Sequence, residues 1–155
     1  MRRFSRIFAW TTLFFVAGAV LFFTKAAALP YKVAWPVLLL SLATFLSRRR
    51  ELLPFGFAFL FSAAGDAVGA RGLFIPQMAF FALAHAAYVC WFLPRARRRL
   101  RAVSLAVTVP LLVFLFAAIV PEAPFPAERI GVAVYGLVIA AMLYSALQYL
   151  SLIHI

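Results

Sequence analysis

Two ionisable residues, Asp66 and His85, lie inside long apolar stretches of the sequence. A charged group inside a membrane is costly, so such residues face the protein interior and are functional candidates. An aspartate in that setting can donate a proton, accept one or stabilise a developing positive charge. A histidine can titrate near neutral pH or bind a metal as neutral imidazole. These two residues are therefore the first candidates for a chemical role.

Small and polar residues accompany Asp66 on the helix that we predict around it. At 3.6 residues per turn, Ser62, Asp66 and Gly69 share one face, and Gly65 lies beside them. Small residues allow a ligand or a second backbone to approach closely. The alternative is structural: the aspartate bonds a neighbouring helix or reaches the outer membrane interface. We favour a functional role, because the apolar stretches contain so few acids.

A second polar stripe surrounds the histidine. Gln77, Phe81, His85 and Tyr88 lie within ~80° of one another on a helical wheel. A buried, hydrogen-bonded histidine and a functional one are equally good interpretations of this stripe. One histidine without acidic or cysteine partners at ligand spacing is a weak metal signal, so we predict no metal site. No nucleophile elbow, phosphate-binding glycine loop or HExxH motif is found in the sequence.

The elements that must position these residues are long and apolar. The chain has 155 residues, of which 67% are hydrophobic and 12% are charged, and its mean hydropathy is +1.05. A membrane-spanning helix needs ~20 mostly apolar residues. We predict an all-α, polytopic transmembrane helix bundle that forms a single domain over residues 1–155. About six spans are expected, at residues 7–23, 33–47, 52–70, 73–93, 102–120 and 130–150.

The basic residues indicate the orientation of this bundle. The formal net charge is +11, but fourteen of the 15 Lys and Arg precede position 102, nearly all in short clusters between apolar runs. That placement argues against a nucleic-acid partner and is typical of cytoplasmic anchors. Eleven basic residues fall on one side of the predicted membrane and four on the other. The N-terminus is therefore expected in the cytoplasm.

The predicted hairpin of the third and fourth spans limits how the candidates meet. Its turn lies near "ARGLF", so equal counts back from the turn place Asp66 nearest Gln77 to Ala79. His85 then lies ~8 to 12 Å deeper along the helix. We expect the two residues to line one cavity, suited to an elongated amphiphilic ligand, rather than to form a direct pair. In the last span, Tyr135, Met142 and Tyr149 share a face that we interpret as a packing seam.

One stretch resembles a known family. "LFSAAGDAVGARGLFIPQMAFFALAHAAYVCWF" is similar to the signature of the YhhN family of lysoplasmalogenase-like membrane proteins. In that family a small-Gly-Asp triplet ends one helix, and a Phe-x3-His-x2-Tyr stripe occupies the next. A weaker likeness covers "YKVAWPVLLLSL", where Lys32 is kept and the family's proline is displaced, and "AVYGLVIAAMLYSAL".

The resemblance implies a hydrolase that cleaves the vinyl ether bond of lysoplasmalogens to a fatty aldehyde and a glycerophospho-headgroup. Asp66 and His85 would be catalytic, and the substrate-binding or orienting residues would be Ser62, Gly65, Gln77, Phe81, Tyr88 and Lys32. The implied partners are a lysophospholipid or ether-lipid substrate and membrane lipids, with no cofactor. The implied location is the bacterial inner membrane.

The sequence also departs from the family pattern. Family members have about eight helices, and a later one carries a second aspartate; here the acids after Asp66 are Glu122 and Glu128, in a proline-rich loop. We therefore expect a C-terminally truncated chain whose last residues are not native. Two alternatives stay open: a small transporter or channel that uses Asp66 and His85, and a non-catalytic membrane subunit.

Overall fold

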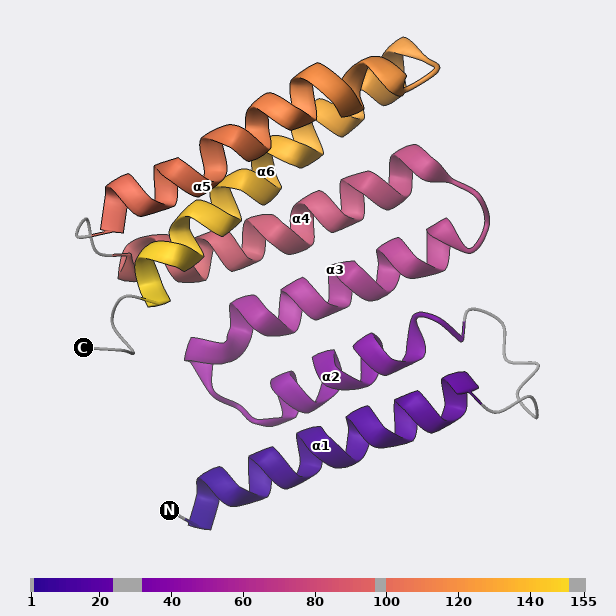
Figure 1. Cartoon of the computed structure of the whole chain (residues 1–155). Coiled ribbons are helices and arrows are strands. Elements are labelled where there is room, and N and C mark those ends of the chain that lie inside the picture. Colours follow the sequence, from indigo (N-terminus) through magenta and orange to yellow (C-terminus); the bar gives the residue numbers. More distant parts are fainter. Residues whose placement is uncertain (1, 24–31, 97–99, 151–155) are drawn as a thin grey trace. The chain divides into compact units, whose positions relative to one another are not determined.

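The computed structural model describes residues 2–23, 32–96 and 100–150, and within these ranges it contains helices and no strand. This confirms the all-α prediction, and each predicted span corresponds to one helix (Figure 1). Segments 24–31, 97–99 and 151–155 lie outside the described residues. They contain four of the basic residues that we used to predict the orientation. They also contain the C-terminal residues that we expect to be non-native. The α-helices of the described ranges are α1 (Arg2–Phe23), α2 (Trp35–Leu46), α3 (Leu53–Gly69), α4 (Phe74–Phe92), α5 (Arg101–Phe114) and α6 (Pro126–Leu150).

Among the described residues, four helical segments are long and apolar enough to cross a membrane, judged by length and composition. They are Arg50–Gly69, Phe74–Arg95, Arg101–Glu122 and Pro126–Tyr149. The helix α2 is apolar but has only 12 residues, with a proline in its first turn. The helix α1 has 22 residues and begins at Arg2, five residues before the predicted span.

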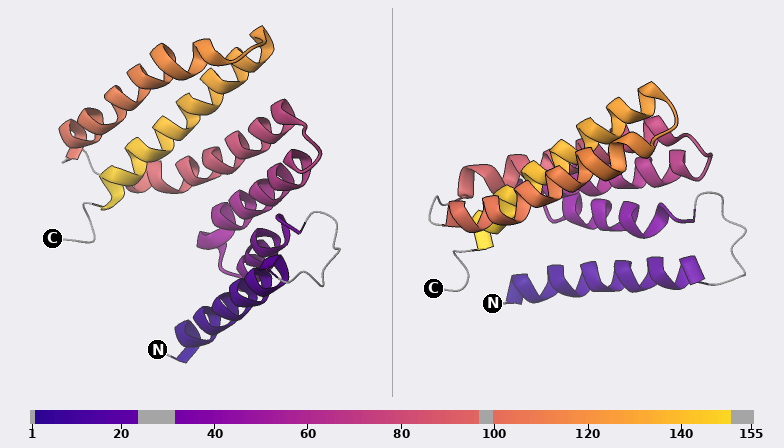
Figure 2. Two further views of the ribbon diagram at one scale, coloured as in Figure 1. Left: turned by 45° about the vertical axis from the view of Figure 1, so that its right-hand side comes forward. Right: turned by 45° about the horizontal axis from the view of Figure 1, so that its top comes forward.

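The first of two compact units extends to Phe80 and contains α1, α2, α3 and the start of α4. Small residues bring its helices close together. A side chain at Gly18 of α1 would collide with Pro36 of α2, and one at Gly56 of α3 would collide with the Phe45 ring. The hydroxyl of Ser41, which is buried, donates a hydrogen bond of 2.9 Å to the carbonyl of Gly56. Neighbouring helices in this unit run antiparallel (Figure 2).

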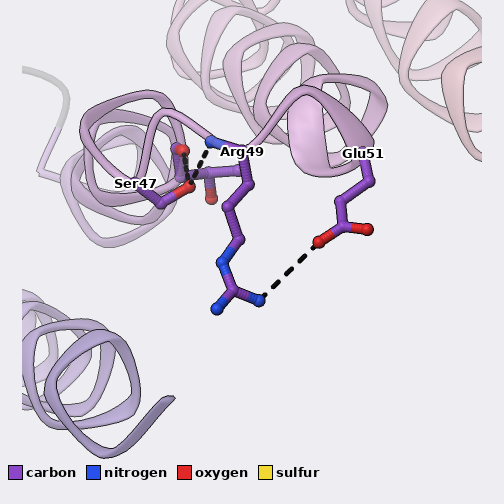
Figure 3. Close-up of polar contacts among 4 residues, drawn as sticks. Ser47, Arg49 and Glu51 are labelled. Carbon is purple, nitrogen blue, oxygen red and sulfur yellow. Dashed lines mark hydrogen bonds and ion pairs between the residues drawn. The ribbon is translucent and has the colours of Figure 1, made fainter. Parts of the chain in front are cut away.

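The loop between α2 and α3 is basic and locally ordered (Figure 3). The Ser47 hydroxyl donates to the Thr44 carbonyl at 2.6 Å and accepts the backbone N–H of Arg49 at 3.4 Å. The guanidinium of Arg49 lies 3.7 Å from the carboxylate of Glu51, which belongs to the 3-10 turn η1 (Arg50–Leu52). Both side chains are solvent-accessible, so this ion pair orders the loop more than it stabilises the fold.

The turn between α3 and α4 is as tight as the sequence predicts. Gly72 has φ +73°, a left-handed conformation that glycine adopts without strain. The N–H of Leu73 donates to the carbonyl of Val68, and the N–H of Gly72 donates to the carbonyl of Gly69. This pair of bonds is the Schellman motif, which satisfies the last carbonyls of a helix. It fixes the direction in which the chain returns into α4.

The second unit begins at Phe81 and contains the rest of α4, α5 and α6. Beyond Phe114, α5 continues as a π-helical segment, η4 (Leu115–Ile119), and a 3-10 turn, η5 (Val120–Glu122). Pro110 lies inside α5 and cannot donate a backbone hydrogen bond. The helices α5 and α6 pack as an antiparallel pair (Figures 1 and 2). A side chain at Gly136 of α6 would collide with that of Leu115, so η4 and α6 are in close contact.

Candidate functional site

Asp66 lies near the C-terminal end of α3, on the face that the periodicity predicts. Ser62 is one helical turn earlier, and both side chains are half-buried, whereas Gly65 is buried. Within the described ranges the carboxylate of Asp66 makes no ion pair and accepts no hydrogen bond. A carboxylate in such a setting is available to a ligand rather than engaged in the fold.

Gln77, in the first turn of α4, reaches back to the end of α3. A Cβ atom added to Gly69 would lie 2.5 Å from the Gln77 side-chain amide, so that amide fills the space that the glycine leaves. Gly69 is on the same face of α3 as Asp66, one turn closer to the loop. The sequence places Asp66 nearest Gln77 to Ala79, and that placement stays a prediction; the observed neighbour of the Gln77 amide is Gly69.

An apolar cavity of about 310 Å³ lies between α2 and α3, within the first unit. Its lining residues are Ala34, Trp35, Leu38, Leu60, Ala63, Ala64 and Ala67. Asp66 adjoins Ala67 in the chain, and the exposed Lys32 lies two residues before Ala34. Because α2 and α3 are antiparallel, the start of α2 and the end of α3 meet at the same end of this cavity. We did not predict this cavity from the sequence. The alanines around Asp66 could have indicated it, because small side chains leave space between helices.

His85 is half-buried in α4, and its ring is bonded to its own helix. The Nδ1 atom lies 2.7 Å from the carbonyl oxygen of Phe81. A carbonyl oxygen can only accept, so Nδ1 must carry the proton of this hydrogen bond. In the neutral ring, Nε2 is then the atom with the free lone pair, able to accept a proton.

Two tyrosines flank the His85 ring edge-to-face. The ring of Tyr88 lies 6.3 Å from it, centroid to centroid, at an interplanar angle of 79°. The ring of Tyr135, from α6, is closer, at 5.6 Å and 77°. Tyr135, which the sequence analysis assigned to a packing seam, therefore contacts the polar stripe of α4. The wheel of α6 alone could not reveal this contact, because it depends on how α6 packs against α4.

The predicted site residues fall into two groups. Ser62, Gly65, Asp66, Gln77 and Lys32 belong to the first unit, whereas Phe81, His85 and Tyr88 belong to the second. The single cavity expected to join Asp66 and His85 stays a prediction. Within the described ranges, no three His, Cys, Asp or Glu side chains are grouped as a metal site requires.

The comparisons with known proteins give one match. The model of the YhhN family matches residues 28–154, which is most of the chain and includes α2 to α6. The match contains every predicted site residue, from Lys32 to Tyr88. A comparison with the curated proteins and with the solved structures gives no match.

Proposed function

The chain belongs to the YhhN family of membrane proteins, and on that basis we propose that it is a membrane-embedded hydrolase resembling lysoplasmalogenase. Its substrate would be a lysoplasmalogen, whose vinyl ether bond is cleaved to a fatty aldehyde and a glycerophospho-headgroup. The observation that carries the proposal is the apolar cavity between α2 and α3, which has Asp66 and Lys32 beside its lining residues in the chain.

That cavity suits a molecule with one long apolar chain and one charged head. Its lining of alanine, leucine and tryptophan is almost wholly apolar, so an alkenyl chain is the favoured occupant. The ammonium group of Lys32 can attract the phosphate of the headgroup. The vinyl ether bond of such a lipid lies between its chain and its headgroup, the region in which a carboxylate at Asp66 would act.

The chemistry requires one proton at carbon. The Asp66 carboxyl group would protonate the vinyl carbon remote from oxygen, giving an oxocarbenium ion that the resulting carboxylate stabilises. Water then adds to the carbon bonded to oxygen and loses one proton to Nε2 of His85; that proton returns to Asp66 before the next turnover and restores its carboxyl group. The hemiacetal that forms breaks its bond to the glycerol oxygen, releasing the aldehyde and the headgroup alcohol. Protons and atoms balance with water as the only co-substrate.

The remaining candidates take supporting roles in this proposal. His85 would accept a proton from water through Nε2 and so serve as a second catalytic group, with Tyr88 orienting water or substrate. Ser62 and Gly65 leave room for the substrate on the face of Asp66, and Gln77 and Phe81 orient it. The location we propose is the bacterial inner membrane, with the N-terminus in the cytoplasm.

Product identity in heavy water tests the proposal. The full chain, in membranes, is incubated with lysoplasmalogen and, separately, with the lysolipid that has an ester in place of the vinyl ether. We expect fatty aldehyde from the first only, with one deuterium on the carbon next to the aldehyde carbonyl. Release of fatty acid from the ester, or no aldehyde at all, contradicts the proposal. Ion-dependent uptake into vesicles without aldehyde would favour the transporter alternative instead.

A further inference from the structure

We propose that Tyr135 is a positioning residue for His85. Its ring keeps the imidazole in the orientation that bonds Nδ1–H to the Phe81 carbonyl, so that Nε2 stays unprotonated in the neutral ring. The assignment of this tautomer stands on geometry alone. Its consequence for catalysis rests on the proposed function, in which Nε2 accepts a proton.

The imidazole of His85 can change its orientation unless its surroundings hold it. A histidine ring can turn about its Cβ–Cγ bond, and a quarter-turn would carry Nδ1 away from the Phe81 carbonyl and change the plane of the ring. The 2.7 Å hydrogen bond opposes that turn from one side of the ring. Edge-to-face contacts with Tyr88 and Tyr135 oppose it as well, because turning the imidazole would break both favoured ring geometries.

Tyr88 and Tyr135 are not equivalent supports. Tyr88 is on the same helix as His85, so its place follows from the helix itself. Tyr135 comes from α6 and has the shorter centroid distance, 5.6 Å against 6.3 Å. This contact makes the orientation of His85 depend on the packing of a second helix.

The packing of α6 is in turn fixed next to Tyr135. Gly136 follows it directly and faces the side chain of Leu115 with no room for a Cβ atom. Leu115 begins the π-helical segment η4, and π-helical turns occur often near functional sites. A close contact on one side of α6 therefore holds the Tyr135 backbone where its ring reaches His85.

Nitrogen NMR of isotope-labelled histidine tests the tautomer directly, because protonated and unprotonated ring nitrogens give well-separated signals. All variants carry His154→Gln, so that His85 is the single labelled histidine. With the neutral ring, we expect one tautomer, protonated at Nδ1, in the parent and in Tyr135→Phe, which keeps the aromatic ring. In Tyr135→Leu we expect the second tautomer to appear.

A matched control comes from the same helix. Tyr149 also packs edge-to-face, on Trp91 at 5.0 Å and 71°, and no ring contact with His85 is found for it in the described residues. The variant Tyr149→Leu removes a comparable aromatic contact from α6 and should leave the His85 signals unchanged. A change in those signals equal to that of Tyr135→Leu would mean general loosening of α6 and would overturn the proposal.

Aldehyde release is the second readout. We expect Tyr135→Leu to lower the rate about 2- to 10-fold, the range that loss of one aromatic pair implies, and Tyr135→Phe to retain it. A parent spectrum that shows the Nε2-protonated or a mixed tautomer overturns the proposal even if the leucine variant does not fold. If no variant releases aldehyde but the tautomer shifts as expected, the positioning role stands and the proposed function fails.

Discussion

At the residue scale, a few polar side chains in apolar surroundings are the candidates for the proposed chemistry. Asp66 and His85 are recognisable from the sequence because each interrupts an apolar helix, and the structure keeps both half-buried. Other features need the fold. The cavity lined by Ala63 and Ala67 and the contact of Tyr135 with His85 both join residues from different helices, and helical spacing within one segment cannot reveal them.

Lys32 provides the first prediction at this scale. Replacing it with glutamine removes the charge that we expect to attract the substrate phosphate, so KM for lysoplasmalogen should rise about 3- to 5-fold with little change in kcat. Lys32→Arg keeps the charge and should retain the parent KM. Steady-state kinetics of aldehyde release make the measurement. A fall in kcat alone would count against a headgroup role.

Filling the cavity is the second prediction. Ala67 lines it and is only half-buried, so Ala67→Leu can add volume there without severe overpacking of the core. We expect the variant to prefer shorter alkenyl chains than the parent, as measured with a chain-length series of lysoplasmalogens. Ala70→Leu, at an exposed position in the following turn, is the control and should leave the preference unchanged. If Ala67→Leu leaves the chain-length preference unchanged, the alkenyl chain of the substrate does not bind in this cavity.

At the element scale, the length of each apolar run and the turn residues account for most helix ends. The π-helical segment η4 depends in addition on packing between helices. Apolar run length places the helices to within a few residues, and Gly72 marks the turn into α4 by its left-handed conformation. The π-helical segment η4 is not predictable in this way. Two features accompany η4: Pro110 lacks a backbone N–H donor, and Leu115 packs closely on Gly136. The packing of Leu115 depends on α6, whereas the missing donor at Pro110 can be read from the sequence.

Gly136→Ala tests that packing. The added Cβ atom must displace the Leu115 side chain, so we expect a destabilisation of about 1 to 3 kcal/mol. Leu115→Ala makes room, and the double variant should recover part of the loss relative to the sum of the single changes. Thermal unfolding in detergent measures all three. Strict additivity of the two changes would show that this contact does not position α6.

At the scale of the whole molecule, membership of the YhhN family and the apolar helices agree on a multi-pass membrane protein. Composition predicts that class, because only burial in lipid accommodates so many exposed large apolar side chains, such as Phe23 and Ile130. Composition says nothing about the reaction. Activity is instead proposed from Asp66, an acid within an apolar helix, and from the cavity lined by its neighbour in the chain, Ala67.

The rate of aldehyde release by Asp66→Asn is the most direct test of this account. The change keeps the size of the side chain but removes its acidic proton, so proton transfer to the vinyl carbon should be lost. We predict a fall of at least about 100-fold, the scale of general acid catalysis, while Glu122→Gln, an acid in the loop before α6, stays at the parent rate. An Asp66→Asn protein that releases aldehyde at the parent rate would contradict the central claim.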